Sequence, residues 1–507
     1  MIGCHALTVF GKACFVVVDW MKTLLAEDGQ AVAPRKRVKL TDRFSVQYGM
    51  NRTFTHAIVA SALTFTSYAA TAVEPDYSEM VAKQVAPAIK GGLFPGAVIG
   101  IYKDGKASFY PVGTLNFDTD EAPTIDTLYE IGSISKVFTG VLFADAVRRG
   151  EVSRDTLVDD LLPDGYKVKT KEGEDLKLWH LTTHTSGWAT APINFAPADG
   201  EKPFTGYTQE MMFEAVNLMP LQQAPGTKFE YSNFAVGVLG TLVSINAHGE
   251  YEAIVKERVI EPLGIENFTI ALDEDQQQLL APATASGRQT KAWGKTGPID
   301  PAGMWVTNAP GLLKFAVANL GEHEGEIYES LTLAREPLFD LGNGQKICSG
   351  WFIAGDGSTY WHNGMTGGYS SYMAVNPTFN ATVVILTNGA SLQTTAVGEK
   401  IIQSVFGMNP APISLEPGDQ LDEAYTDRLV GVYHSALGFD MTITATRGRV
   451  FAQITGQQAL ELIKTGETRF KIRLVEAELE FDLPEEGEAK SVTLFQNGRE
   501  IKCERKE

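Results

Sequence analysis

The spacing of one serine and one lysine strongly constrains the fold of this chain. Ser133-Ile134-Ser135-Lys136 is its only Ser-x-x-Lys sequence. Residues three apart share one face of a helix, so the hydroxyl and the amine would lie side by side. The apolar, β-leaning segment 128–131 precedes it, Gly132 breaks that segment, and a helical pattern runs from Ser133 to about Arg149. We therefore expect a strand that is followed at once by a buried helix, with the side chains of Ser133 and Lys136 in the first turn of that helix.

This pairing suggests a chemical role. A serine hydroxyl is a weak nucleophile until an adjacent base takes its proton. Lysine can be that base only where burial or nearby positive charge lowers its pKa. The positive end of a helix dipole is such a place. The pattern therefore predicts Ser133 as a nucleophile and Lys136 as its base.

Two further motifs follow in the chain, Tyr231-Ser232-Asn233 and His362-Asn363-Gly364. A tyrosine beside a protonated lysine in a dry cleft can move protons near neutral pH. Glycines such as Gly364 let the backbone approach a substrate closely. Taken alone, these motifs would be a half-buried aromatic before a helix and a glycine turn between strands. Their order after Ser133 favours a shared site.

The longer string Tyr-Glu-Ile-Gly-Ser-Ile-Ser-Lys, ending at Lys136, resembles the nucleophile motif of class C β-lactamases and the related penicillin-binding serine peptidases and esterases. The segments 178–187, 223–226, 301–304 and 364–369 resemble further motifs of that family, and the likeness covers about residues 73–408. It implies an α/β (α+β) fold of the β-lactamase/transpeptidase type: an antiparallel sheet flanked by helices, with a helical subdomain.

The resemblance also implies roles for the site residues. Ser133 would form an acyl-enzyme, Lys136 would accept its proton, and Tyr231 would pass the proton to the leaving group. The backbone N–H groups of Ser133 and Met365 would form the oxyanion hole, which usually supplies the largest catalytic contribution. Asn233 would hold Lys136 and the carbonyl side of the substrate. The substrate and oxyanion set is thus Asn233, His362, Gly364 and Met365.

The third motif departs from the β-lactamase pattern. Those enzymes use Lys-Thr-Gly, whose lysine attracts a substrate carboxylate. Two such strings occur, at 295–297 and 464–466, but the first lacks a following strand and the second falls in a hairpin turn. His362 takes the place of that lysine, and an unperturbed histidine is mostly neutral at pH 7. His-x-Gly occurs in relatives that act as D-aminopeptidases or esterases. His184 is interpreted as a structural residue of its loop.

We therefore expect a serine hydrolase that cleaves ester or amide bonds of small acyl or short-peptide substrates. The alternatives are a β-lactamase or D-Ala-D-Ala carboxypeptidase and, from another class, a penicillin-binding sensor with negligible turnover. The net charge of −19 argues against nucleic acid as a partner. No uninterrupted apolar run reaches the 18 or so residues of a membrane span. An oligomer is compatible with the sequence.

The cysteine and histidine spacing contains no metal-ligand pattern, so neither a metal nor a cofactor is expected. Cys348 and Cys503 are interpreted as free buried thiols, with pairing in an oxidising compartment as the alternative.

Five segments are expected along the chain. Residues 1–49 form a doubtful upstream extension, and residues 50–72 have the pattern of a signal peptide, with a buried helix as the alternative. If Met50 is the true start, the protein is exported to the periplasm or secreted. The hydrolase domain covers 73–407, and a Pro-rich linker covers 408–421. Residues 422–507 resemble the lipocalin-like β-barrel domain that is appended to some hydrolases of this family.

The strand pattern supports both folded domains. Segments 97–102 and 107–112 form a predicted hairpin around Asp104-Gly105. They share a sheet with the closing strands 359–361, 371–375 and 383–386, which a helix at about 395–406 follows. Six short strands separated by turns fill the C-terminal domain and predict a small barrel or sandwich. The expected strands are 441–446, 450–455, 460–463, 470–473, 479–483 and 492–496.

Overall fold

The computed structural model describes residues 76–170, 175–196, 202–321, 323–415, 420–455, 459–473 and 475–506. The predicted extension and signal peptide lie outside these residues. Within the described residues, no helix is both long and apolar enough to cross a membrane.

An eight-stranded antiparallel sheet forms the centre of the first domain, in the order β2-β1-β12-β11-β10-β9-β8-β7. The predicted hairpin is present, and Asp104 and Gly105 form its turn with φ of 49° and 89°. β1 pairs with β12, with Ala97 opposite Thr387, so the first and last strands share one sheet as expected. The strands are β1 (Gly96–Lys103), β2 (Lys106–Gly113), β7 (Phe339–Asp340), β8 (Lys346–Ile347), β9 (Phe352–Ile353), β10 (Tyr360–Met365), β11 (Ser370–Asn376) and β12 (Ala381–Thr387).

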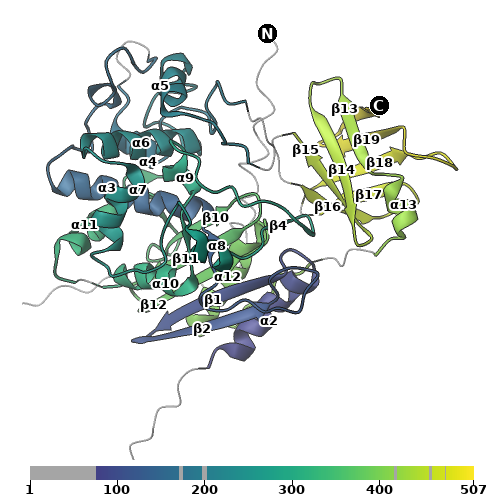
Figure 1. The fold of residues 1–507 in the computed structure, drawn as a ribbon, viewed down its shortest axis with the longest axis horizontal. Coiled ribbons are helices and arrows are strands. Elements are labelled where there is room, and N and C mark those ends of the chain that lie inside the picture. Colours follow the sequence, from purple (N-terminus) through teal and green to yellow (C-terminus); the bar gives the residue numbers. More distant parts are fainter. Residues whose placement is uncertain are drawn as a thin grey trace, which may run out of the picture. The chain divides into compact units, whose positions relative to one another are not determined.

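Helices cover both faces of this sheet (Figure 1). Because side chains alternate along a strand, Ile99 and Ile101 of β1 face one core cluster and Val98 faces the other. Helices α2 (Ser78–Lys90) and α12 (Gln393–Val405) contribute to the cluster of Ile99. Helix α10 (Ala309–Ala318) packs on the face of Val98. The central strands β1, β11 and β12 are thus buried on both faces, which explains the nearly continuous apolar sequences of β1 and β12.

A helical region is built around α3 (Ser135–Arg148), whose residues from Ser135 to Ala146 are all buried. Most of these residues are apolar, as expected for a helix that is buried on every side. It packs against α6 (Asn233–Asn246), α9 (Asp300–Gly303) and α11 (Glu326–Ala334). The predicted helix start needs a correction: Gly132–Ile134 form a 3-10 turn and the α-helix begins at Ser135. Such tight turns are common at helix N-termini.

Shorter elements complete this domain. They are α4 (Leu178–Thr182), α5 (Gln209–Leu218), α7 (Tyr251–Val255), α8 (Glu274–Leu279), the paired strands β3 (Tyr129–Glu130) and β6 (Val306–Thr307), and the pair β4 (Thr284–Ala285) and β5 (Arg288–Gln289).

The C-terminal domain is a closed eight-stranded barrel in which consecutive strands are neighbours. The six predicted strands correspond to β14–β19. Two strands were not predicted, β13 and β20, and their pairing of Ser435 with Cys503 closes the barrel. β20 was missed because charged residues dominate it. A short helix, α13 (Glu423–Asp427), precedes β13. The strands are β13 (Gly431–Ser435), β14 (Asp440–Thr446), β15 (Arg449–Ile454), β16 (Leu460–Lys464), β17 (Arg469–Ile472), β18 (Ala477–Asp482), β19 (Ser491–Gln496) and β20 (Arg499–Arg505).

Cys348 and Cys503 are both buried free thiols, which confirms their interpretation.

Candidate active site

Ser133 and Lys136 lie together where the 3-10 turn joins α3. Ser133 is half-buried, whereas Lys136 is only 1% exposed. The Lys136 Nζ lies 3.0 Å from Ser133 Oγ and donates a hydrogen bond to the carbonyl oxygen of Ala302 at 2.5 Å. Burial holds the pKa of Lys136 well below its ordinary value of 10.5. The amine can therefore be neutral at moderate pH and accept the serine proton.

Strand β10 packs unusually closely on the serine turn, and two glycines permit this contact. A Cβ at Gly364 would lie 1.9 Å from the carbonyl oxygen of Ile131. Gly132 has a φ of 51°, and a Cβ there would lie 2.4 Å from the backbone nitrogen of Met365. Ser371 Oγ donates to the same Ile131 oxygen at 2.7 Å and ties β11 to this turn. The turn is therefore held against backbone atoms of β10 and against the Ser371 side chain of β11.

The register of the sheet orients the Met365 amide. The Thr366 N–H donates to the Tyr369 carbonyl at 3.0 Å, and hydrogen-bonded pairs alternate along an antiparallel ladder. Met365 is paired with Ser370, one position along, so its N–H points away from β11. On the other side of β10, β9 pairs only with Tyr360 and Trp361. The Met365 N–H lies instead beside Gly132, the residue before Ser133.

Tyr231 lies against the lysine. Its half-buried ring has the Lys136 Nζ 4.9 Å from its centroid. Ser232 caps α6 by accepting the Ala235 N–H at 3.0 Å, and Asn233 is the first residue of that helix. The hydrogen bonds described for the Lys136 amine go to Ser133 and Ala302. The expected contact of Asn233 with Lys136 stays a prediction.

His362 is buried in β10, with 1% of its surface exposed. Its Nδ1 lies 2.5 Å from the Asn363 carbonyl oxygen, which can only accept, so the proton is on Nδ1. Burial, followed by the positive charge of Lys136, lowers the pKa of His362 to about 3. The ring is therefore neutral at physiological pH and supplies no fixed cation.

The two Lys-Thr-Gly strings lie in other places. Thr296 and Gly297 donate backbone N–H groups to the Asp300 carboxylate at 2.7 and 3.1 Å, in a loop before α9. Lys464 ends β16, and residues 465–468 form the turn into β17. Neither string lies on β10, where the serine turn packs.

Sequence reasoning assigned no role to three groups around the site. They are the Ala302 carbonyl, which accepts from Lys136, Ser371, which fixes Ile131, and Glu130. Glu130 is 2% exposed and accepts the Gly294 N–H at 2.7 Å. Burial raises the pKa of Glu130, although the bond from Gly294 opposes this shift. Glu130 stands out in the sequence as an acidic residue within an apolar strand, and Ala302 lies in the segment 301–304 that resembles a family motif.

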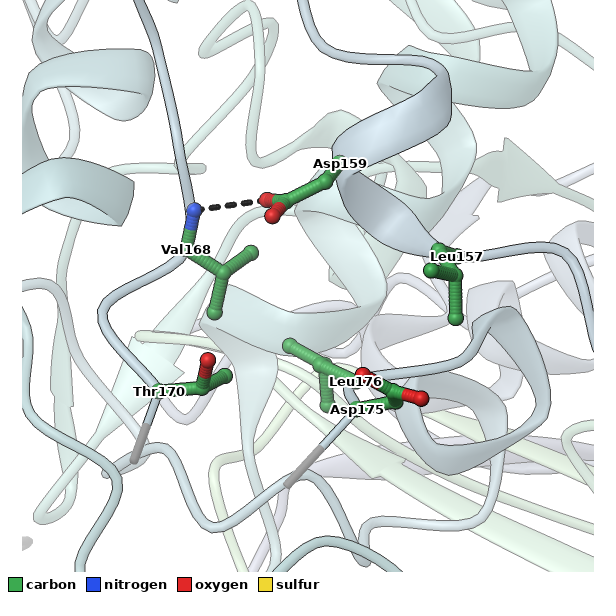
Figure 2. Close-up of a pocket in the computed structure, with 6 residues that line it drawn as sticks. All are labelled: Leu157, Asp159, Val168, Thr170, Asp175 and Leu176. Atoms are coloured by element: carbon green, nitrogen blue, oxygen red, sulfur yellow. Dashed lines mark hydrogen bonds between the residues drawn. The ribbon is translucent and has the colours of Figure 1, made fainter. Parts of the chain in front are cut away.

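A separate small pocket involves none of these residues (Figure 2). In it, Asp159 accepts the Val168 N–H at 2.7 Å. Its lining is Leu157, Asp159, Val168, Thr170, Asp175 and Leu176. Among the residues that the structure describes, no cluster of histidine, cysteine and acidic side chains could hold a metal ion.

Residues 81–404 match the Beta-lactamase family, which is well over half of the chain. The chain belongs to the beta-lactamase family. Residues 416–505 match a second family, described as a domain of unknown function (DUF3471). The family expected from the motifs around Ser133 is thus confirmed, and a barrel domain follows it.

Curated relatives agree with this assignment. The chain is 26% identical to a beta-lactamase of Escherichia coli (strain K12), over 49% of this chain and 64% of that protein. It is 24% identical to penicillin-binding protein 4 of Amycolatopsis lactamdurans, over 58% of this chain and 81% of that one. It is 25% identical to the D-alanyl-D-alanine-carboxypeptidase/endopeptidase AmpH of E. coli, over 44% and 58%. The chain spans 50–64% of three beta-lactamase relatives.

Solved structures share the fold. A beta-lactamase/D-alanine carboxypeptidase from Yersinia pestis superposes with a TM-score of 0.57 at 19% identity, covering 65% of this chain and 97% of that one. A class C beta lactamase from Rhodobacter sphaeroides gives 0.57 at 21% identity, covering 65% and 100%. The predicted fold class is therefore confirmed for the first domain, and the closed barrel confirms it for the second.

Proposed function

We propose that this member of the beta-lactamase family is a serine hydrolase that forms an acyl-enzyme on Ser133. The observation that carries the proposal is the amine of Lys136, 3.0 Å from Ser133 Oγ and buried so that its pKa is depressed. An adjacent base of this kind is what activates a serine hydroxyl. The half-buried Ser133 remains accessible while its base is shielded from water.

In the proposed reaction, Ser133 Oγ attacks the substrate carbonyl as its proton passes to Lys136 Nζ. The developing oxyanion accepts hydrogen bonds from the backbone N–H groups of Ser133 and Met365. Tyr231, against the lysine, then relays the proton to the leaving group as the carbonyl–heteroatom bond breaks. Water hydrolyses the acyl-enzyme by the reverse proton path. Positioned proton transfer contributes about 100- to 10,000-fold in rate, and each oxyanion donor about 100- to 1,000-fold.

The proposed substrate class rests on the absence of a positive charge on His362. Because its ring is neutral, β10 presents no cation to a substrate carboxylate. This favours neutral esters and amine-bearing peptides over carboxylate-bearing β-lactams and D,D-peptides. The second candidate remains a β-lactamase or D-Ala-D-Ala carboxypeptidase, as the names of the relatives indicate.

The test is Ser133→Ala, assayed with short p-nitrophenyl esters, D-amino-acid amides and nitrocefin. We expect the variant to lose hydrolysis and covalent labelling by a fluorophosphonate. Ser153→Ala, at an exposed serine, is the control and should match wild type. Labelling that survives in Ser133→Ala would place the nucleophile elsewhere. A stoichiometric burst without steady turnover would instead favour the penicillin-binding sensor.

Two further features of the protein belong to this proposal. The pattern of residues 50–72 supports export to the periplasm or outside the cell, and mature protein from that location should begin near Val73. A mature cytosolic protein beginning at Met1 would contradict export.

The barrel has the consecutive strand order of lipocalin-like up-and-down barrels. Its interior is filled by side chains such as Tyr433, Phe470 and Phe481, which favours a packing or oligomer-forming role over a ligand-binding one.

A further inference from the structure

We propose that His184 is a positioning residue that orients Tyr231 toward Lys136. This inference rests on the proposed function, because it assigns a role within the same proton path. The ring of His184 stacks on that of Tyr231, with centroids 4.2 Å apart and planes 28° apart. Lys136 Nζ lies 4.9 Å from the centroid of the same tyrosine ring. Both neighbours therefore contact the ring of the tyrosine.

His184 also fixes the backbone around Tyr231. Its Nδ1 accepts the Ser232 N–H at 3.2 Å, and its carbonyl oxygen accepts the Glu230 N–H at 2.7 Å. Its ring also meets Phe229 edge to face, with centroids 5.8 Å apart. One histidine therefore contacts four consecutive residues, 229–232.

This segment requires such support because it lies in neither a helix nor a strand before α6 begins. Within the part of the chain that the structure describes, Tyr231 belongs to no regular ladder of a helix or a strand. A proton relay tolerates little misplacement, since an error of 1 Å at a reacting group can cost about 100-fold in rate. His184 itself is buried and has a φ of 59°, a conformation that the surrounding structure must hold in place for a non-glycine residue.

The electrostatics agree with a positioning role rather than with a general base. Burial is the largest cause that lowers the pKa of His184, and repulsion by the protonated forms of Lys136 and His362 acts in the same direction. The titratable groups around it are these two side chains and Tyr231. The Nδ1 lone pair already accepts the Ser232 N–H. A neutral ring in this position orients the phenol without competing with Lys136 for the serine proton.

The decisive variant is His184→Asn, which tolerates positive φ and can still accept a hydrogen bond but has no ring to stack. The chain offers a matched control in His248→Asn, since His248 is exposed and has a φ of 57°. We expect His184→Asn to lower kcat for a p-nitrophenyl ester by about 10- to 100-fold, with KM within twofold of wild type. His248→Asn should change neither parameter.

The pH profile separates positioning from general destabilisation. Removing the stacked ring admits water beside Lys136, which weakens the desolvation that depresses its pKa. The acid limb of the pH profile of kcat should then move to higher pH in His184→Asn and stay in place in His248→Asn. A double variant tests whether His184 acts through Tyr231. On a Tyr231→Phe background, His184→Asn should lower kcat by less than about threefold, because the effects of coupled residues are not additive.

Three results would overturn the inference: a kcat for His184→Asn within twofold of wild type, an unmoved acid limb, or an undiminished effect on the Tyr231→Phe background. If His184→Asn does not fold, His184→Gly tolerates the positive φ and also removes the ring. Its fluorophosphonate labelling rate should fall by about 10- to 100-fold, and a rate within twofold of wild type would refute positioning by the ring. Wild type that is not labelled on Ser133 would refute the proposed function instead.

Discussion

Replacing Gly364 by alanine tests whether the contact between β10 and the serine turn creates the oxyanion site. The added Cβ would lie 1.9 Å from the Ile131 carbonyl oxygen and 2.6 Å from Ser371 Oγ. Real Cβ atoms essentially never approach another atom closer than 3.0 Å, so β10 and the turn must separate by about 1 Å. The obstructing atom belongs to the backbone and cannot rotate away. Met365, the next residue, must move with the strand.

The size of the effect follows from this displacement. Moving one oxyanion donor by about 1 Å is comparable to removing it, which costs about 100- to 1,000-fold in kcat, or about 2.7–4 kcal/mol in the barrier. KM should change little because the donor acts mainly in the transition state. Overpacking should also lower the free energy of unfolding by about 1–3 kcal/mol.

The assay is steady-state hydrolysis of a short p-nitrophenyl ester, together with thermal unfolding. Gly355→Ala is the matched control, because Gly355 lies before β10, is exposed and has no atom within 4 Å of an added Cβ. It should behave as wild type. If Gly364→Ala retains kcat within threefold while Ser133 is still required, the oxyanion site does not depend on this contact and the reasoning fails.

Two further predictions concern the charged groups. Lys136→Met should abolish hydrolysis. The free energy of unfolding of the variant relative to wild type should also rise by up to about 1.4 kcal/mol per pH unit as the pH falls below 10.5, because the folded wild type resists protonation of this buried amine. Urea unfolding between pH 6 and 9 would show a constant difference between the two proteins if the pKa of Lys136 were not depressed. His362→Lys should raise the ratio of kcat/KM for an anionic β-lactam to kcat/KM for a neutral ester by roughly ten- to hundredfold, or about 1–3 kcal/mol. This gain should be smaller at high salt. The same ratio in the variant and in wild type would mean that residue 362 does not face the substrate.

Local patterns predicted most of the architecture. The turn at Asp104-Gly105 and the alternating strands around it require only neighbouring residues, and β1 and β2 appear as expected. The same holds for the six barrel strands with clear turn signals. β20 has only Ile501 and Cys503 as apolar residues, so its burial depends on its neighbours β13 and β19 rather than on its own pattern.

The site residues divide in the same way. Ser133, Lys136 and Tyr231 could be named from motif order, because three-residue helical spacing alone brings the first two together. The hydrogen-bond acceptor of Lys136 could not be predicted in this way, because the Ala302 carbonyl lies 166 positions from the lysine in the sequence. The contacts of His184 could not be predicted either, because the sequence indicates only a structural role in its loop.

By itself the sequence determined the Ser-x-x-Lys spacing, the order of the motifs and the absence of a lysine at position 362, because these are properties of residue identity and short spacing. Only the tertiary structure decided that Lys136 can be a neutral base and that His362 is a neutral ring. Desolvation depends on every group that excludes water from a site. Here those groups come from α3, α9 and β10, segments that are far apart in the chain and meet only in the folded protein.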